Sequence, residues 1–318
     1  MAGKSVVVGI DGSPASARAA AFGWRLAQAL RNDCRLVYVA PDTWLSDYAG
    51  QPPMASRRLL DEVVALARGR IAETLAGAVP AELVERLDVR LGRAAVALRA
   101  AGDQLDAPYI VLGGKHHTTL GRTLAGSTAR DLVRITDRPV LVLGEGDRPF
   151  RRVLAAIDLS AAARPTVSAA RRLARVLQAE LRVMTVMEPV RVPLTIPFAI
   201  DEAEIGRRAA AAFERLERAI AGTPHGEWVL RHGVAEDAIA TAATEWGADI
   251  VVVGSHGKGW VDRVLIGSTT ERLLAALPAG LLVVPTGRRA AAQRRMPPKA
   301  GASVRRRARS RSKRGVAV

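Results

Sequence analysis

The chain has 318 residues, 49% of them hydrophobic, which is enough for two ordinary domains with packed cores. Its single cysteine, Cys34, excludes an intramolecular disulfide and a cysteine-based metal site, and favours a reducing compartment. The net charge of +16 points to anionic partners, but it falls to +4 when the twelve Arg and Lys residues between Arg288 and Val318 are set aside.

Short hydrophobic runs alternate along the chain with Ala-, Arg- and Leu-rich segments of helical spacing. A Pro-rich segment, residues 41–56, is predicted to be a loop. In the first half the runs predict strands near residues 5–10, 35–40, 84–91, 109–113 and 139–143.

The second half repeats this alternation, with a predicted helix at 204–221 and a Pro-rich loop at 188–201. Its strands are predicted near residues 152–158, 181–187, 227–231, 249–254 and 281–284. No run approaches the roughly 20 residues that span a bilayer, and the N-terminal run is too short for a signal-peptide core. A cytoplasmic protein is therefore expected.

The two halves are copies of one pattern. Asp11 and Asp158 follow the first strand of each half and lie 147 residues apart. Gly113 and Gly254 lie 141 residues apart, as do the segments "AGSTARDLVR" and "IGSTTERLLA". We predict one domain at 1–147, a second at 148–287, and a basic, disordered tail at 288–318.

Alternating strands and helices imply an α/β fold with a doubly wound parallel sheet in each half. Such sheets bind ligands beyond the carboxyl ends of the strands, where the strand order reverses. For the order 3-2-1-4-5 this point lies between strands 1 and 4. Asp158 and Gly254, which end those two strands in the second half, are then expected to share one crevice.

The stretch "GSHGKGWVDRVLIGST" has the composition of a phosphate cradle. Gly254 and Gly257 would let the backbone approach a phosphate, with positive φ angles that glycine adopts cheaply. Gly267 then leads into a helix whose free N–H groups suit an anion, and Ser268 and Thr269 add hydroxyls. For Ser268 alone, a helix N-cap is the simpler interpretation.

The spacing Gly254-x2-Gly257-x9-Gly267-Ser268 resembles the nucleotide-binding signature of the ATP-binding universal stress proteins. The resemblance covers residues 4–286 and implies two tandem five-stranded sheets of order 3-2-1-4-5, of the adenine-nucleotide α-hydrolase-like type. It also implies pairing of the fifth strands within the chain, with a homodimer as a further option. The implied ligand is ATP, with or without Mg²⁺, in a regulatory stress-response protein with little or no catalysis. The implied site is Asp158, Val186, Val253, Gly254, Gly257, Gly267, Ser268 and Thr269.

The first copy departs from this signature. "GGKHHTTLGRTLAGST" has His116 where the second glycine belongs, so this site is expected to be weaker or empty. The pair His116–His117 is expected in a surface loop and not at a metal, because adjacent side chains rarely face one site. The positions that match the signature here are Asp11, Val39, Gly113, Gly126 and Ser127.

Two other functions stay open. One is a slow ATPase or a nucleotidyltransferase-type enzyme of the same superfamily, although "GIDGSPAS" and "AIDLSAAA" match no catalytic loop of that class. The other is a protein that binds polyanions or nucleic acid through its basic tail. The tail lacks aromatic residues for base stacking, so such binding would be sequence-independent and salt-sensitive.

Overall fold

A computed structural model describes most of both halves of the chain. The described residues are 3–40, 53–117, 122–124, 126–144, 149–158, 160, 162–187, 207, 210–211, 214, 227–256, 266–276 and 279–286. The predicted loop at 188–201, the predicted tail at 288–318 and Gly257 lie outside them, as does most of the predicted helix at 204–221.

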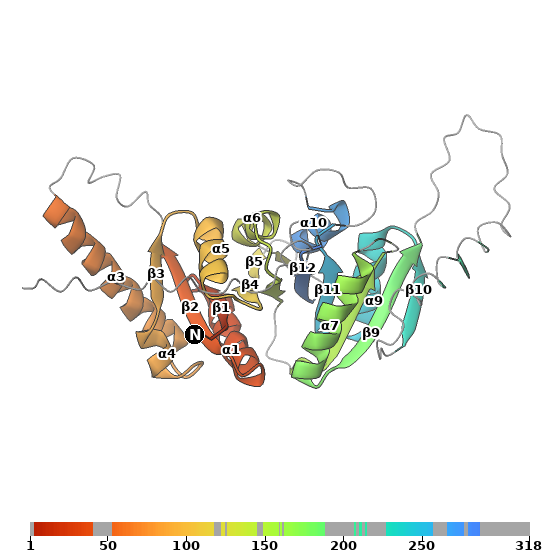
Figure 1. Cartoon of the computed structure of the whole chain (residues 1–318), viewed down its shortest axis with the longest axis horizontal. Helices are drawn as coiled ribbons and strands as arrows, with labels where there is room; N and C mark the ends of the chain where they lie inside the picture. Colours follow the sequence, from red (N-terminus) through yellow and green to blue (C-terminus); the bar gives the residue numbers. More distant parts are fainter. Residues whose placement is uncertain are drawn as a thin grey trace, which may run out of the picture.

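The helices and strands alternate through both halves (Figure 1). The first half contains β1 (Ser5–Ile10), α1 (Pro14–Ala29), β2 (Asp33–Ala40), α3 (Pro53–Leu75), α4 (Ala81–Glu85), β3 (Asp88–Leu91), α5 (Ala94–Gln104), β4 (Ile110–Gly113), β5 (Lys115–His117), β6 (Arg122–Leu124), α6 (Ser127–Ile135) and β7 (Val140–Leu143). The second half contains β8 (Arg152–Ile157), α7 (Ala163–Leu177), β9 (Glu180–Met187), β10 (Trp228–His232), α9 (Ala235–Trp246), β11 (Ile250–Gly254), α10 (Ser268–Ala275) and β12 (Gly280–Val284).

Ten of the described strands form one continuous sheet in the order β10-β9-β8-β11-β12-β7-β4-β1-β2-β3. Each half therefore has the predicted order 3-2-1-4-5, with parallel neighbours throughout. The halves join through their fifth strands, where β12 and β7 run antiparallel with Leu282 opposite Leu141. The expected pairing of fifth strands is thus present within this chain.

The sheet is covered on both faces, which explains why its central strands are runs of Val, Ile and Leu. One hydrophobic cluster packs α1, α3, α4 and α7 against the sheet, with Leu26, Ile71 and Leu173 among its buried members. A second cluster lies on the opposite face under α5, α6, α9 and α10, with Leu132 and Leu273 buried. Both clusters extend through both halves, so the two domains share their core across the β7–β12 join.

The core also contains Cys34, which is buried beneath the first helix layer. Burial raises the pKa of its thiol to about 12, so it is protonated at neutral pH and suits packing rather than nucleophilic chemistry. The segment between the domains is anchored in the same layer, because the rings of Phe150 and Phe22 meet edge to face at 4.5 Å.

Three local predictions were wrong. The third strand begins at Asp88, because Ala81–Glu85 form the short helix α4. Residues 53–56, predicted as loop, are the first turn of α3, which tolerates Pro53 because the first helical position needs no backbone N–H. The pair His116–His117 lies in β5, which forms a two-stranded antiparallel sheet with β6.

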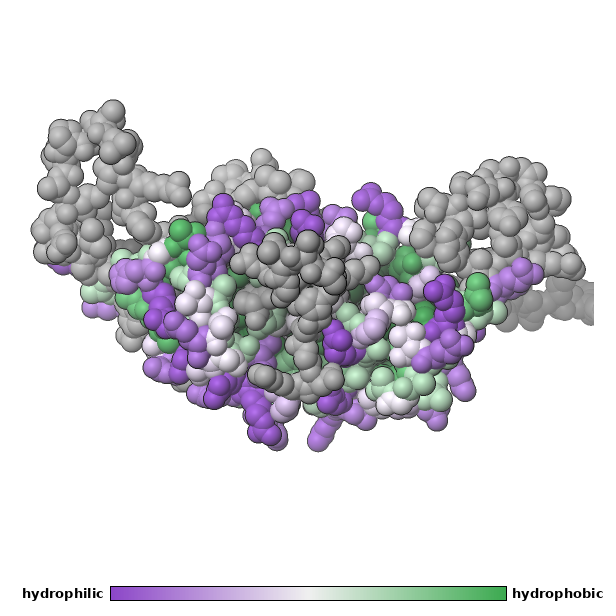
Figure 2. All heavy atoms as spheres, turned by 180° about the vertical axis from the view of Figure 1, so that it is seen from behind, coloured by the Kyte–Doolittle hydropathy of each residue, from purple (hydrophilic) through white to green (hydrophobic). Residues whose placement is uncertain are grey.

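Both polar and apolar residues are visible on the surface. On the face shown in Figure 2, strongly hydrophilic side chains are interspersed with weakly hydrophobic ones over both domains. In the described part of the chain, no helix is both long and apolar enough to cross a membrane.

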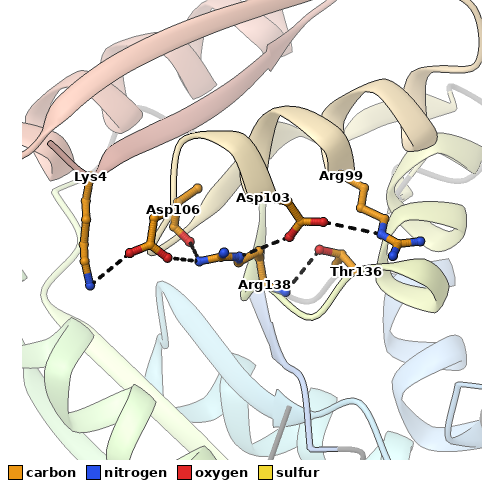
Figure 3. A network of polar contacts seen from close by, with 7 residues as sticks. Lys4, Arg99, Asp103, Asp106, Thr136 and Arg138 are labelled. Atoms are coloured by element: carbon orange, nitrogen blue, oxygen red, sulfur yellow. Dashed lines mark hydrogen bonds and ion pairs between the residues drawn. The ribbon is translucent and has the colours of Figure 1, made fainter. Parts of the chain in front are cut away.

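A chain of ion pairs ties the amino-terminal edge of the first domain (Figure 3). Asp106 accepts from Arg138 Nη1 at 2.6 Å and faces Lys4 Nζ at 3.4 Å. Arg138 Nε also faces Asp103 at 3.4 Å, and Asp103 faces Arg99 at 3.7 Å. These residues precede β1, β4 and β7 or lie on α5, so the network links the starts of three strands to one helix.

The hydrogen bond from Arg138 is the largest factor that lowers the pKa of the Asp106 carboxyl. A carboxyl with a lowered folded pKa stabilises the fold above its unfolded pKa, and this stabilisation is lost as the pH falls through the folded pKa. We expect Asp106→Asn to lower the free energy of unfolding at pH 7 by up to about 1 kcal/mol and to flatten its decline below about pH 4. Urea unfolding at pH 7 and across pH 4 to 2.5 measures both effects.

Asparagine suits this test because Asp106 has a left-handed backbone, φ 44°, which asparagine tolerates. Asp61→Asn, on an exposed position of α3, is the control for loss of one carboxylate. An Asp106→Asn protein with the pH profile of wild type would contradict the prediction.

Candidate functional site

In the second domain, β8 and β11 part at their carboxyl ends, and we call the place between these ends the crevice. These strands pair only over Ile250–Val252 of β11, opposite Val153–Ala155 of β8. β8 leads through α7 to β9 on one side, while β11 leads through α10 to β12 on the other. The strand order reverses here, so the carboxyl ends of β8 and β11 border the place where ligands bind to such sheets.

Asp158 follows β8 directly and thus lies at this edge. Its Oδ1 accepts the Ser160 backbone N–H at 3.1 Å and the Ser160 hydroxyl at 2.6 Å. The first domain repeats this turn, in which Asp11 Oδ1 accepts from the Ser13 N–H at 3.0 Å and the Ser13 hydroxyl at 2.5 Å. Both aspartates therefore also shape the turn into the next helix, which the sequence alone did not predict.

Gly254 ends β11 at a crowded position. A Cβ placed there would lie 3.2 Å from Thr166 Oγ1 on α7 and 3.3 Å from the His256 carbonyl oxygen. The glycine thus allows a helix and a loop to approach the end of the strand. The predicted positive φ angle of Gly254 was wrong, because Gly254 is not among the positive-φ residues.

Hydroxyl groups hold the two ends of the following loop. Ser255 is buried, and its Oγ accepts the Thr286 N–H at 3.1 Å and lies 2.9 Å from His256 Nδ1. Thr286 Oγ1 in turn accepts the His256 N–H at 3.1 Å. On the far side of the loop, the Thr270 hydroxyl donates to the Gly254 carbonyl at 2.8 Å and the Gly267 N–H donates to the Ser255 carbonyl at 3.0 Å.

The loop leads into α10, whose N-cap is Gly267 and whose first residue is the exposed Ser268. The N-cap is Gly267, so the simpler interpretation of Ser268 as the N-cap is wrong, and no side chain of the described residues caps the helix. Thr269 is the second residue. Among the described residues, the amides of Ser268 and Thr269 have no acceptor, so these donors remain available at the positive end of the helix.

The valines of the expected site lie deeper. Val253 is 4% exposed and packs in the cluster beneath α9 and α10. Val186 and Val39, each the penultimate residue of a second strand, pack partly buried against the same cluster. These two valines lie one residue before the carboxyl ends of their strands.

The first domain repeats one backbone hydrogen bond of this arrangement but lacks two of these hydroxyls. Gly114 replaces Ser255, and its N–H donates to the Leu143 carbonyl at 2.9 Å as that of Ser255 does to Val284. Ala129 replaces Thr270. The N-cap of α6 is Gly126, and no side chain of the described residues caps this helix. Ser127 is its first residue, just as Ser268 is the first residue of α10.

In the first domain, the end of β4 lies closer to α1 than the end of β11 lies to α7 in the second domain. A Cβ at Gly113 would lie 2.5 Å from the carbonyl carbon and oxygen of Ala15, in the first turn of α1. Beyond Gly113 the chain forms β5 and β6. The copies therefore differ in their anchoring side chains as well as in the missing glycine.

The helices that follow the two candidate sites, α6 and α10, are in contact across the join. α6 and α10 pack side by side near the middle of the molecule (Figure 1), and β6 also lies against α10. Arg134 Nη2 on α6 lies 2.6 Å from Glu271 Oε1 on α10. Sequence comparison of the copies could have found Ser255 and Thr270, but not this contact between domains.

A separate cavity of about 120 Å³ lies under α9, lined by Leu154, Arg182, Val229, Arg231, Ala242, Glu245 and Trp246. Its arginines are already ion-paired, Arg182 with Glu227 at 2.5 Å and Arg231 with Glu245 at 2.6 Å. None of the expected site residues lines it, so we place the candidate site at the crevice between β8 and β11.

Comparisons with known proteins agree on one family. The model of the universal stress protein family matches residues 3–144 and again 149–285. A universal stress protein of Thermus aquaticus is 33% identical over 136 residues, covering 42% of this chain and 98% of that protein. One from Mycolicibacterium smegmatis is 27% identical over 295 residues, covering 88% of this chain and 96% of the relative.

Among solved structures, a universal stress protein from Archaeoglobus fulgidus has a TM-score of 0.60 at 18% identity, covering 89% of this chain and 98% of that one. At this identity the likeness supports the fold, whereas the family model and the relatives cover both halves of the sequence. The chain therefore belongs to the universal stress protein family and carries two copies of its domain in tandem.

Proposed function

We propose that this protein binds an adenine nucleotide, ATP, in the crevice of its second domain and acts as a regulatory protein in a stress response. The observation that carries the proposal is the uncapped N-terminus of α10, held by Thr270 and Ser255 at the mouth of the crevice. Free amides and a positive helix end favour a phosphate group. Ser268 and Thr269 offer hydroxyls at the same place.

The opposite wall suits the nucleoside. Asp158 presents a carboxylate at the end of β8, where it can accept from ribose hydroxyls or an adenine amino group. Val186, the penultimate residue of the neighbouring strand β9, supplies an apolar contact for the base. Hydrogen-bond donors on one side of the crevice match the phosphates of a nucleotide, and the carboxylate on the other side matches its ribose and base.

The second domain is the better site of the two. Its loop ends are held by Ser255, Thr270 and Thr286, so the donors around the ligand are positioned before binding. The first domain has Gly114 and Ala129, which lack hydroxyls, at two of these positions. Its strand end at Gly113 also lies so close to α1 that even a Cβ there would clash with the helix backbone. We therefore assign one nucleotide per chain, in the second domain.

Binding without rapid turnover fits the polar groups on this edge. Asp158 shapes a turn with Ser160, and His256 Nδ1 lies against the Ser255 hydroxyl within the loop anchor. These groups hold the geometry of the site. The nucleotide then acts as a bound ligand, with or without Mg²⁺.

The test is equilibrium binding of ATP to wild type and to Gly257→Glu. Because Gly257 is the middle glycine of the nucleotide-binding signature, we expect a glutamate there to repel the phosphates and to lower ATP affinity at least about tenfold. Isothermal titration calorimetry, with Mg²⁺ and then with EDTA, gives the affinity and the stoichiometry, which we expect to be one.

Gly69→Glu is the matched control, because it introduces the same charge on α3 of the other domain, where a Cβ at Gly69 would meet no atom within 4 Å. Unchanged ATP affinity in Gly257→Glu would refute the assigned site. Rapid ATP turnover by the wild type would favour the enzyme alternative.

A further inference from the structure

We propose that Arg134, a residue of the first domain, sets the phosphate affinity of the second-domain site by neutralising Glu271. This inference rests on the proposed function. Arg134 lies in the last turn of α6, and Glu271 lies in the first turn of α10. Their side chains meet at 2.6 Å across the domain join.

The position of Glu271 explains why its charge matters. An acid in the first turn of a helix is favourable while the helix end is empty, because it faces the positive end of the dipole. When a phosphate binds at the same end, that carboxylate becomes a like charge close to the ligand. A guanidinium on the carboxylate cancels most of this repulsion.

The packing around the pair keeps the two charges together. α6 lies against α10, and the antiparallel β7–β12 join fixes the sheet beneath them. Arg134 and Glu271 are 38% and 43% exposed, so water screens the pair and the effect on binding is a few-fold.

The pair occurs on one side only. The repeat places Arg130 of α6 where α10 has Glu271, and Ala275 of α10 where α6 has Arg134. The first turn of α6 thus has no acid to neutralise, whereas that of α10 has one and receives a cation from the other domain. The first domain therefore completes the electrostatics of the second-domain site.

The experiment compares ATP with adenosine, which lacks phosphates, as ligands for the full chain at low salt. Arg134→Ala is expected to weaken ATP binding about two- to fivefold and to leave adenosine binding unchanged. Arg134→Lys should retain most of the ATP affinity. Glu271→Gln added to Arg134→Ala should restore it, because no carboxylate is then left to neutralise.

Arg99→Ala is the control, since Arg99 is also 38% exposed, is paired with an aspartate and lies on α5 of the same domain. Equal losses for ATP and adenosine would show a structural role and overturn the inference, as would unchanged ATP binding in Arg134→Ala. A loss that Glu271→Gln does not restore would also overturn it. Wild type that binds neither ligand would refute the proposed function, and this inference with it.

Discussion

Gly113→Ala is expected to lower the free energy of unfolding by about 2–3 kcal/mol. The new methyl group would sit 2.5 Å from the Ala15 carbonyl and 2.9 Å from the Ser16 nitrogen, all backbone atoms of the first turn of α1. Backbone cannot rotate away as a side chain can, so α1 must shift off the sheet. Guanidinium unfolding followed by circular dichroism measures the loss.

Gly267→Ala is the matched control for this prediction. Gly267 has φ −58°, and the nearest atom to its Cβ, the Ser255 carbonyl oxygen, is 3.5 Å away, an ordinary contact. We expect its stability to stay within about 0.5 kcal/mol of wild type. If Gly113→Ala were equally harmless, the close approach of α1 to β4 would be wrong.

The second large effect concerns binding. Gly267→Asp places a carboxylate at the uncapped N-terminus of α10, where it can accept from the first-turn amides. We expect ATP affinity to fall at least about tenfold while the free energy of unfolding stays equal or rises by about 0.3–1 kcal/mol. Calorimetry and thermal unfolding of the same samples separate the two effects.

Gly267→Asn provides the control for charge. An asparagine also caps a helix, but it adds no negative charge, so ATP affinity should fall less than with aspartate. Unchanged ATP affinity in Gly267→Asp would exclude the N-terminus of α10 as the phosphate site. Lost affinity accompanied by lost stability would instead indicate a misfolded loop.

Much of the fold could be predicted because its signals are local and occur twice. Runs such as "VVVGI" and "DIVVV" are buried on both faces, and the 141-residue spacing aligned the domains. The errors arose where short segments carry mixed signals. Leu83 and Leu87 are both buried, one on α4 and one before β3, so hydrophobicity alone did not separate helix from strand.

The candidate site was predictable in outline and not in its contacts. Parallel strands bring Asp158 and Gly254 to one edge, because their position follows from strand ends alone. The bonds of Thr270 to Gly254 and of Thr286 to His256 join residues 16 and 30 positions apart, and nothing local in the sequence predicts them. The contact between Arg134 and Glu271 depends on how the two domains pack, and the local sequence pattern of either domain does not predict this packing.

The antiparallel join of β7 and β12 makes the molecule a pseudo-dimer encoded in one chain. In a dimer of identical subunits, any substitution appears on both sides of the axis, so a residue that helps one site is also imposed on the other. Here α6 and α10 can change independently, and Arg134 faces Glu271 without a counterpart facing Arg130. Under the proposed function, fusion of the two copies permits a division of labour, in which one half binds the nucleotide and the other half supports its site.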